Sequence, residues 1–316
     1  MKSAAIEIVP CPAALARDAL ALVLRGIALE QRSMIAPQLG GPLQSQSALV
    51  DGLWIARQGE HVGGAAWGQP QPGNTAIFWP PQLAAGTDPC IAAELSQAVV
   101  GSLDAAGVGM TQVVLPDRQT NATPTIESVG FQYLVDLLYL TSETSAAGQR
   151  NRVPTRSEPA DPLQFVPYAE SQRKRLCDLV EQTYEGTRDC PAMNGRRTID
   201  EVVDGYRATG VFQPQHWQIV RAGQQDVGVL LLAEHRAASH FELVYMGLVP
   251  AARGRGWGLH VTRQAQQIAA NAGAERLVLA VDAANLPALA MYRDAGFVAW
   301  DRRAVFVRFG ADSTAT

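Results

Sequence analysis

The sequence repeats itself, and this repeat limits the possible folds more than any other feature of the chain. The stretch IEIVPCPAALARDALALVL (6–24) resembles LQFVPYAESQRKRLCDLVE (163–181), an offset of 157 residues. Farther along, AAGVGMTQVVLPDRQTNATPTIESVGF (105–131) resembles NAGAERLVLAVDAANLPALAMYRDAGF (271–297), an offset of 166 residues. Because the offset grows slowly, as short loop insertions would make it grow, we predict two copies of one fold.

A β-hairpin pattern lies between these stretches and also occurs twice. LWIARQGEHVGG (53–64) and WQIVRAGQQDVGV (217–229) each show apolar alternation around a polar turn that contains glycine. Each copy reads as a strand and two helices, a hairpin, and then alternating strands and helices. This order predicts an α/β fold with a mixed, mostly antiparallel sheet flanked by helices. We place the first copy at 1–145 and the second at 163–316, joined by a polar linker at 146–162.

Composition and charge exclude several classes of protein. The 316 residues are 47% hydrophobic, which is enough for two cores. A net charge of −4 argues against a general binder of nucleic acid or of anionic membranes. No apolar run reaches the ~18–20 residues of a membrane span. The 4 cysteines form no CxxC pair, so we expect neither a bound metal nor a disulfide framework, and we expect the cytoplasm as the location.

A glycine-rich loop follows the hairpin of the second copy. We predict a strand at about 241–249, the loop at 250–256, a helix at about 257–272 and another strand at about 276–281. The free N–H groups and the partial positive charge at the start of a helix attract phosphate. The order strand, loop, helix therefore puts this loop where a phosphate could bind.

The residues of the loop suit a pyrophosphate. Gly254, Gly256 and Gly258 would let the backbone close on the phosphate oxygens, while Arg253 and Arg255 add positive charge. The loop lacks the GK[ST] ending of a P-loop and the third glycine of a dinucleotide-binding GxGxxG pattern. A flexible turn without a ligand is the remaining alternative.

Two motifs carry a resemblance to a known family. RGRGWG (253–258) resembles the R/Q-x-x-G-x-G/A acyl-CoA loop of the GNAT superfamily of N-acetyltransferases, and NLPALAMYRDAGF (285–297) is similar to its closing motif. The resemblance covers about 163–310, and the first copy resembles a degenerate GNAT, so the chain resembles tandem GNAT enzymes. It implies acetyl transfer from acetyl-CoA to a primary amine of a small molecule or a peptide, without a metal.

The resemblance also implies roles for individual residues in holding coenzyme A. The loop would hold the pyrophosphate through its backbone N–H groups. The residues at the end of the preceding strand would pair their backbone with the pantetheine arm, which lies between two splayed strands like an added strand. The asparagine of the closing motif would contact the pantetheine or orient the closing helix. The full set is Leu248, Val249, Arg253, Gly254, Arg255, Gly256, Trp257, Gly258 and Asn285.

The reaction needs a proton acceptor for the amine and a proton donor for the departing thiolate. Tyr292 matches the family's usual general acid. We propose Glu242, on the predicted strand before the loop, as the base or as the holder of the substrate ammonium. Strand alternation puts Glu242 on one face with Val244 and Met246.

Other polar residues near this strand are weaker candidates for the base. Glu234, His235 and His240 fall in the predicted hairpin turn, where we expect solvated side chains.

The segment QTYEGTRDCPAMNGRRT (182–198) joins the first two helices of the second copy, a region that walls the acceptor pocket in GNATs. Tyr184, Glu185, Asp189 and Asn194 are the candidate substrate-binding residues, with either carboxylate meeting a cationic amine. A polar loop without a ligand is the alternative. We interpret Cys190 as a small filler, because no histidine is its obvious partner.

The first copy lacks the residues that would make a second site. At an offset of 166, Cys90 and Ala92 stand in place of Gly256 and Gly258, and Ile126 stands in place of Tyr292. We therefore expect a structural partner that binds no acetyl-CoA, in a monomer or a homodimer. Two other functions remain open for the second copy, namely transfer of a longer acyl group and a regulatory module that binds acyl-CoA without catalysis.

Overall fold

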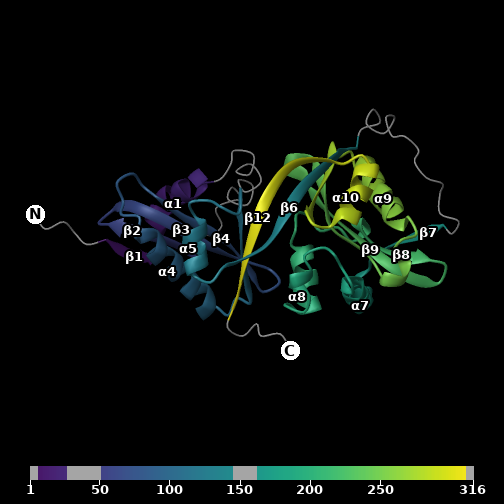
Figure 1. Ribbon diagram of the computed structural model, residues 1–316, viewed down its shortest axis with the longest axis horizontal. Helices are drawn as coiled ribbons and strands as arrows, with labels where there is room; N and C mark the ends of the chain where they lie inside the picture. The colour runs from purple at the N-terminus through teal and green to yellow at the C-terminus, as the bar shows by residue number, and fades with distance from the viewer. Residues whose placement is uncertain (1–5, 27–50, 145–161, 311–316) are drawn as a thin grey trace, which may run out of the picture. The chain divides into compact units, whose positions relative to one another are not determined.

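The chain folds into two compact units, each with a mixed sheet and helices on both faces (Figure 1). The computed structural model describes residues 6–26, 51–144 and 162–310. Unit 1 consists of Met1–Leu134 and Ala304–Thr316, and unit 2 consists of Val135–Arg303. This architecture confirms the predicted α/β class. Among the helices that the structure describes, none has the length and apolar character needed to cross a membrane.

Unit 1 contains a sheet with the strand order β1-β2-β3-β4-β5-β12. Neighbouring strands are antiparallel except for β4 and β5, which are parallel. Helices α4 and α5 cover one face and α1 covers the other. Its described strands are β1 (Glu7–Pro10), β2 (Leu53–Gln58), β3 (His61–Gln71), β4 (Thr75–Leu83), β5 (Met110–Leu115) and part of β12 (Val298–Phe309). Its described α-helices are α1 (Ala16–Val23), α4 (Ile91–Ala105) and α5 (Thr123–Ser128).

Unit 2 contains a sheet with the order β6-β11-β10-β9-β8-β7. Only β10 and β11 are parallel neighbours in it. Helices α9 and α10 cover one face, and α7 and α8 cover the other (Figure 1). Its strands are β6 (Gln132–Glu143), β7 (Leu163–Pro167), β8 (Trp217–Ala222), β9 (Gln225–His235), β10 (His240–Leu248) and β11 (Arg276–Asp282). Its α-helices are α7 (Arg173–Tyr184), α8 (Ile199–Arg207), α9 (Trp257–Asn271) and α10 (Leu286–Asp294).

The bounds of the elements confirm the repeat that the sequence predicts. Helices α4 and α9 both have 15 residues, and strands β6 and β12 both have 12. Each pair is separated by the predicted offset of 166 residues. The second helix expected for the first copy falls at 27–50, and the linker falls almost wholly at 145–161. Both lie outside the described residues.

The boundaries of the compact units differ from those of the two sequence copies, because each copy contributes its last strand to the sheet of the other copy. Strand β6 ends the first copy, but its residues 137–143 pair with β11 in unit 2. Strand β12 ends the second copy, but its residues 304–309 pair with β5 in unit 1. The boundaries drawn at 1–145 and 163–316 follow the repeat and do not include this exchange. Apolar alternation indicates a strand, but it carries no information on which sheet edge the strand joins.

The exchanged strands carry core residues of the units they enter. Phe306 on β12 is fully buried with Phe78 and Phe131 in the core of unit 1. Leu140 on β6 is buried opposite Leu279 of β11 in the core of unit 2. Each sheet therefore depends on a strand encoded by the other copy.

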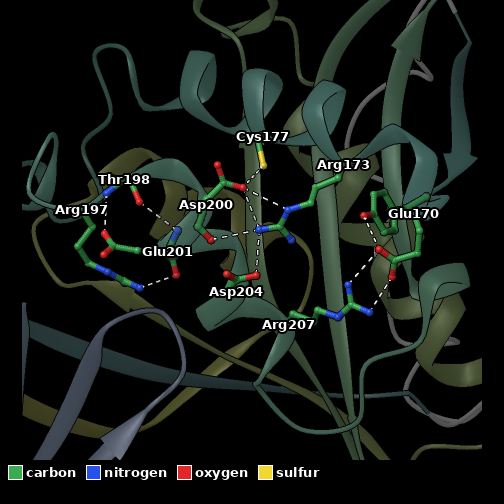
Figure 2. A network of polar contacts seen from close by, with 10 residues as sticks. Glu170, Arg173, Cys177, Arg197, Thr198, Asp200, Glu201, Asp204 and Arg207 are labelled. Carbon is green, nitrogen blue, oxygen red and sulfur yellow. Dashed lines mark hydrogen bonds and ion pairs between the residues drawn. The ribbon is translucent and has the colours of Figure 1, made fainter. Parts of the chain in front are cut away.

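Ion pairs join α7 to α8 on one face of unit 2. Figure 2 shows the Arg173 guanidinium on α7 donating to Asp200 and Asp204 of α8, each at 2.9 Å. Arg207 at the end of α8 pairs with Glu170 at 2.7 Å. The side chains are partly exposed, so each pair contributes little to stability alone, but together they link α7 and the turn before it to α8. These pairs thus restrain α7, and the segment that lines the candidate site begins at the end of this helix.

The strand exchange predicts a reciprocal pattern of destabilisation. Phe306→Ala should lower the free energy of unfolding of unit 1 by about 3–5 kcal/mol, because it opens a cavity in that core. Leu140→Ala is the matched variant and should lower the stability of unit 2 by about 2–5 kcal/mol. Amide hydrogen exchange, read separately for β2 and β3 and for β8 and β9, measures the two effects. Loss of protection in β8 and β9 alone after Phe306→Ala would contradict the exchange.

Candidate functional site

Strands β10 and β11 separate soon after they begin, and a cavity lies where they part. They pair over only three residues each, from His240 to Glu242 and from Arg276 to Val278. Beyond this point lies a cavity of about 390 Å³. Residues 243–248 of β10 and residues 280–281 of β11 form two of its walls. The other lining residues are Thr183, Gly186, Thr187, Arg188, Asp189, Arg253, Asn285, Pro287, Ala288 and Tyr292. The sheet thus opens between the two strands where the sequence predicts a pantetheine arm.

Tyr292 on α10 lines the cavity with a hydroxyl that is free to bind a ligand. The residue is 7% exposed, and its ring packs edge-on against Phe297 with 5.5 Å between ring centroids. Within the described part of the chain, the hydroxyl has no hydrogen-bond partner. Burial, with a smaller effect of the Asp189 carboxylate, raises the pKa of Tyr292 well above its ordinary value. The hydroxyl therefore keeps its proton at neutral pH.

The Asp189 carboxylate is turned toward the cavity, although the residue as a whole is exposed. Its Oδ1 accepts a hydrogen bond from the backbone N–H of Asp282 at 3.0 Å, and its carboxylate also interacts with the Asn285 side chain. Burial of the carboxyl group raises the pKa of Asp189, and the hydrogen bond from Asp282 opposes this rise. Asp189 thus adds a hydrogen-bond acceptor to the wall of the cavity.

A second tyrosine on the lining, Tyr245, has its hydroxyl oriented by Thr183. Thr183 Oγ1 donates to the Val180 carbonyl at 2.6 Å, so Tyr245 Oη must donate to Thr183 Oγ1, also at 2.6 Å. The Tyr245 hydroxyl therefore has only lone pairs left for the cavity. Tyr184, a predicted substrate residue, packs edge-on against Tyr245 and bonds to the Tyr206 hydroxyl at 2.7 Å. It supports the lining and does not form part of it.

A β-bulge decides which side chains of β10 share a face. The pairing of β10 with β9 shifts between Leu243 and Tyr245, at Val244. Leu243 and Met246 both pack in the core beneath α9 and α10, which strict alternation does not allow. The prediction that Glu242 shares a face with Met246 is therefore wrong, because the bulge reverses the alternation.

Glu242 lies at the point where the strands part, outside the cavity lining. Its Oε2 is 2.8 Å from Nε2 of His235. His240 is buried at 4% exposure, and its ring stacks on His235 with 4.7 Å between centroids. The expectation of a solvated side chain is thus wrong for His240, whereas His235 is partly exposed. Burial lowers the pKa of His240, so this ring is neutral near pH 7.

The loop glycines have structural reasons that are independent of phosphate. Gly254 and Gly256 have φ values of +75° and +80°, which L side chains rarely adopt. A Cβ at Gly258 would lie 2.6 Å from Sδ of Met291, so this glycine lets α9 pack closely on α10. Trp257 is buried in the core of unit 2, with the Arg255 guanidinium 5.1 Å from its ring centre.

The Arg253 side chain binds backbone carbonyl groups. Its Nε donates to the Leu248 carbonyl at 3.0 Å, its Nη1 to Gly186 at 3.1 Å and its Nη2 to Thr183 at 2.8 Å. The guanidinium thus joins the end of β10 to the segment that follows α7.

The backbone at the end of β10 is partly occupied as well. The Val249 N–H donates to the Val227 carbonyl at 3.0 Å, and the Val249 carbonyl accepts from Ala252 at 2.9 Å. Leu248 lines the cavity.

The other two predicted substrate residues do not reach the cavity lining. Glu185 and Asn194 are exposed, and Asn194 Nδ2 donates to the Tyr184 carbonyl at 3.3 Å. Thr183 and Tyr245 also line the cavity and are not among the residues predicted from the sequence. Thr183 lies in the polar segment 182–198, but the orientation of Tyr245 depends on the bulge, which no sequence pattern marks.

Unit 1 has the same parting of strands with different chemistry. Its parallel strands pair only from Thr75 to Ile77 and from Met110 to Gln112. At the start of its α4, the Asp88 carboxylate accepts from the N–H of Cys90 at 2.9 Å. A carboxylate thus stands at the helix start that corresponds to the glycine loop.

Comparison with known proteins agrees with this geometry. Residues 181–297 match the model of the acetyltransferase (GNAT) family. This part of the chain is similar to the GNAT family of acetyltransferases. Acyl transfer from acetyl-CoA is the general chemistry of this family.

Individual relatives cover different parts of the chain. Mycothiol acetyltransferase from Jonesia denitrificans is 34% identical over 100 residues, which are 31% of this chain and 32% of that protein. The match thus spans about a third of this curated relative. A GCN5-related N-acetyltransferase from Sphaerobacter thermophilus has a TM-score of 0.62 at 16% identity, covering 98% of both chains. A tandem GNAT protein from the clavulanic acid biosynthesis pathway has a TM-score of 0.52 at 13% identity, covering 99% of this chain and 100% of that one. These two structures support the fold.

The contact of Gly258 with α10 can be tested by a double-mutant cycle. Gly258→Ala should gain less stability than the roughly 1 kcal/mol that the better helix propensity of alanine provides, because the Met291 side chain must move away from the new Cβ. In a Met291→Ala background the same change should be more favourable, and thermal unfolding of the four proteins measures the difference. Equal effects in both backgrounds would contradict the packing role of this glycine.

Proposed function

We propose that unit 2 transfers an acetyl group from acetyl-CoA to a primary amine of a small molecule or a peptide. The observation that carries this proposal is the protonated, unpartnered hydroxyl of Tyr292 on a cavity between two parted strands. A proton donor at this place suits a departing thiolate, which a module that only binds acyl-CoA would not need.

The residues around the cavity fit the parts of acetyl-CoA. Residues 243–248 of β10 line the opening, where β11 no longer pairs with them, so a pantetheine arm could bind there like an added strand. The backbone of Val249 already has two partners, so Leu248 and the residues before it are the better candidates for this pairing. The pyrophosphate would bind at the start of α9, where Gly254 and Gly256 add no side chains to the loop.

The reaction needs no covalent intermediate on the protein, because both substrates can be bound together. The amine nitrogen forms a bond to the acetyl carbon as the bond from carbon to sulfur breaks. The thiolate takes its proton from Tyr292, and the amine gives a proton to Glu242 directly or through water. Since Glu242 lies outside the lining of the cavity, a water molecule is the better route.

The acceptor class follows from the hydrogen-bond acceptors on the cavity. The Asp189 carboxylate and the lone pairs of Tyr245 both favour a group that donates, such as an amine or ammonium. Screening a panel of amines for release of free coenzyme A would identify the acceptor. The panel should include mycothiol precursors, because of the name of the relative from Jonesia denitrificans, and longer acyl-CoA donors should be tested beside acetyl-CoA.

One active site per chain is part of the proposal. Ile126 occupies the place of Tyr292 in unit 1 and is fully buried in its core, and Asp88 would repel a phosphate. Calorimetry should therefore give one bound acetyl-CoA per chain.

Removing the Tyr292 hydroxyl should slow the chemical step. Tyr292→Phe keeps the ring contact with Phe297 and should lower kcat about 10²–10⁴-fold with little change in KM for acetyl-CoA, because the hydroxyl acts mainly in the transition state. Steady-state kinetics of coenzyme A release measures the effect. An unchanged kcat, with chemistry shown to limit the rate, would remove Tyr292 from the role of acid.

The role of Glu242 can be read from the pH dependence. Glu242→Gln keeps the shape of the side chain and removes the base, so kcat should fall. The loss should shrink as pH rises, because more of the amine is then already deprotonated. Comparison of pH–rate profiles for the two proteins tests this. A loss that is independent of pH would instead indicate that Glu242 orients the substrate.

A further inference from the structure

The segment at 186–189 crosses the opening between β10 and β11 and is held at both ends. At one end, Arg253 binds the carbonyls of Thr183 and Gly186 together with that of Leu248 at the end of β10. At the other end, Asp189 Oδ1 accepts from the N–H of Asp282, the last residue of β11. The ends of the two parted strands are thus connected through this segment.

The contact with β11 is reciprocal. While Asp189 accepts from the Asp282 backbone, the Asp282 carboxylate accepts from the N–H of Cys190 at 3.2 Å. Its other oxygen accepts from the Ala284 N–H at 2.8 Å. Asp282 is 5% exposed, so its carboxylate is satisfied almost entirely by these backbone groups.

The backbone of Cys190 indicates that the segment is held under strain. Cys190 has φ +44° and ψ +54°, in the left-handed region that non-glycine residues rarely occupy. Such a conformation persists when the surrounding contacts impose it. The contacts of Asp282 and Arg253 on either side of the cavity are those that could impose it here.

We propose that residues 186–190 form a strap over the cavity, and that Arg253 is a positioning residue that holds this strap and not a ligand of the coenzyme pyrophosphate. Arg253 acts through the strap, which presents the Asp189 carboxylate to the cavity beside Tyr292. The contacts that define the strap are all within the protein and do not depend on the proposed function. Only the purpose of the strap, which is to place the acceptor amine, rests on that function.

The geometry of the guanidinium separates these two roles. Three of its N–H groups are directed at three carbonyls, which belong to α7, to the segment after α7 and to β10. Only a planar group with five donors can serve all of them. A lysine at this position would keep the positive charge, which is what a phosphate needs. It could not bridge the three carbonyls. Arg253→Lys therefore distinguishes a strap holder from a phosphate ligand.

Cys190 supplies a readout that does not depend on activity. Burial, followed by the charges of Asp189 and Asp282, raises the pKa of the Cys190 thiol to about 12, so little thiolate exists at pH 8 while the strap is closed. Release of the strap should bring the pKa toward its ordinary value and speed the reaction with a disulfide reagent. Cys90 is exposed and would react as well, so the experiment uses the full chain with Cys90→Ser. Cys11 and Cys177 are buried.

The experiment measures two quantities for each variant, the rate of Cys190 modification and the Kd of acetyl-CoA by calorimetry. In Arg253→Lys and Arg253→Gln we expect modification at least about tenfold faster, because strap opening no longer breaks charge-assisted hydrogen bonds. For Arg253→Lys we expect the Kd of acetyl-CoA to change less than about threefold, since the charge is kept. Arg255→Lys and Arg255→Gln are the matched controls in the same loop and should leave the rate of modification unchanged. With an amine that gives turnover, Arg253→Lys should raise KM for the amine and not for acetyl-CoA.

Several results would overturn the strap. An unchanged rate at Cys190 in Arg253→Lys would do so, as would a loss of acetyl-CoA affinity in Arg253→Gln with Cys190 still protected. Loss of amide protection in β8 and β9 in both variants would assign Arg253 to the stability of the whole unit and would also overturn it. If the unmodified protein binds no acetyl-CoA, the proposed function fails, while the rate at Cys190 still tests the strap.

Discussion

The parting of β10 and β11 is the feature on which the candidate site depends. Parallel neighbours normally continue to pair, because buried backbone groups without partners cost free energy. Here the pairing ends after Glu242 and Val278, and the strands beyond it form the walls of a cavity. The opening must be held apart by something other than sheet hydrogen bonds. The segment at 186–189 lies outside the sheet and connects the two strand ends. Arg253 binds it near the end of β10, and Asp282 binds it at the end of β11.

The bulge at Val244 gives the opening its two chemically different sides. Upstream of it, Leu243 packs beneath α9 and α10, and downstream of it Met246 does the same. Tyr245 is thereby turned to the face of α7 and α8, where Thr183 orients its hydroxyl. One extra residue in the strand thus separates an apolar side from a side that carries hydrogen-bonding groups.

The sequence predicts local elements well and contacts between distant residues poorly. The strand expected at 241–249 is β10 at His240–Leu248, and the helix expected at 257–272 is α9 at Trp257–Asn271. Periodicity and glycine positions are enough to predict these elements, because both depend on residues only a few positions apart. The face of Met246, the burial of His240 and the partners of Arg253 depend on a bulge and on residues up to 70 positions away. No local pattern records them, and the same holds for the strand exchange.

The exchange gives a physical reason for a chain of this kind to keep a copy without the residues of the site. Unit 1 shares the parted strands, so the opening belongs to the fold. In unit 1, however, Ile126 stands in the place of Tyr292, the proposed acid. Yet the first copy supplies β6, which pairs along the whole length of β11 and buries Leu140 in the core of unit 2. Strand β11 forms one wall of the cavity and ends at Asp282. Without β6, β11 would be an edge strand, paired to β10 over three residues and free to move along the rest. The first copy therefore fixes the wall against which the strap closes, and its loss would loosen the site without removing any residue that touches a substrate.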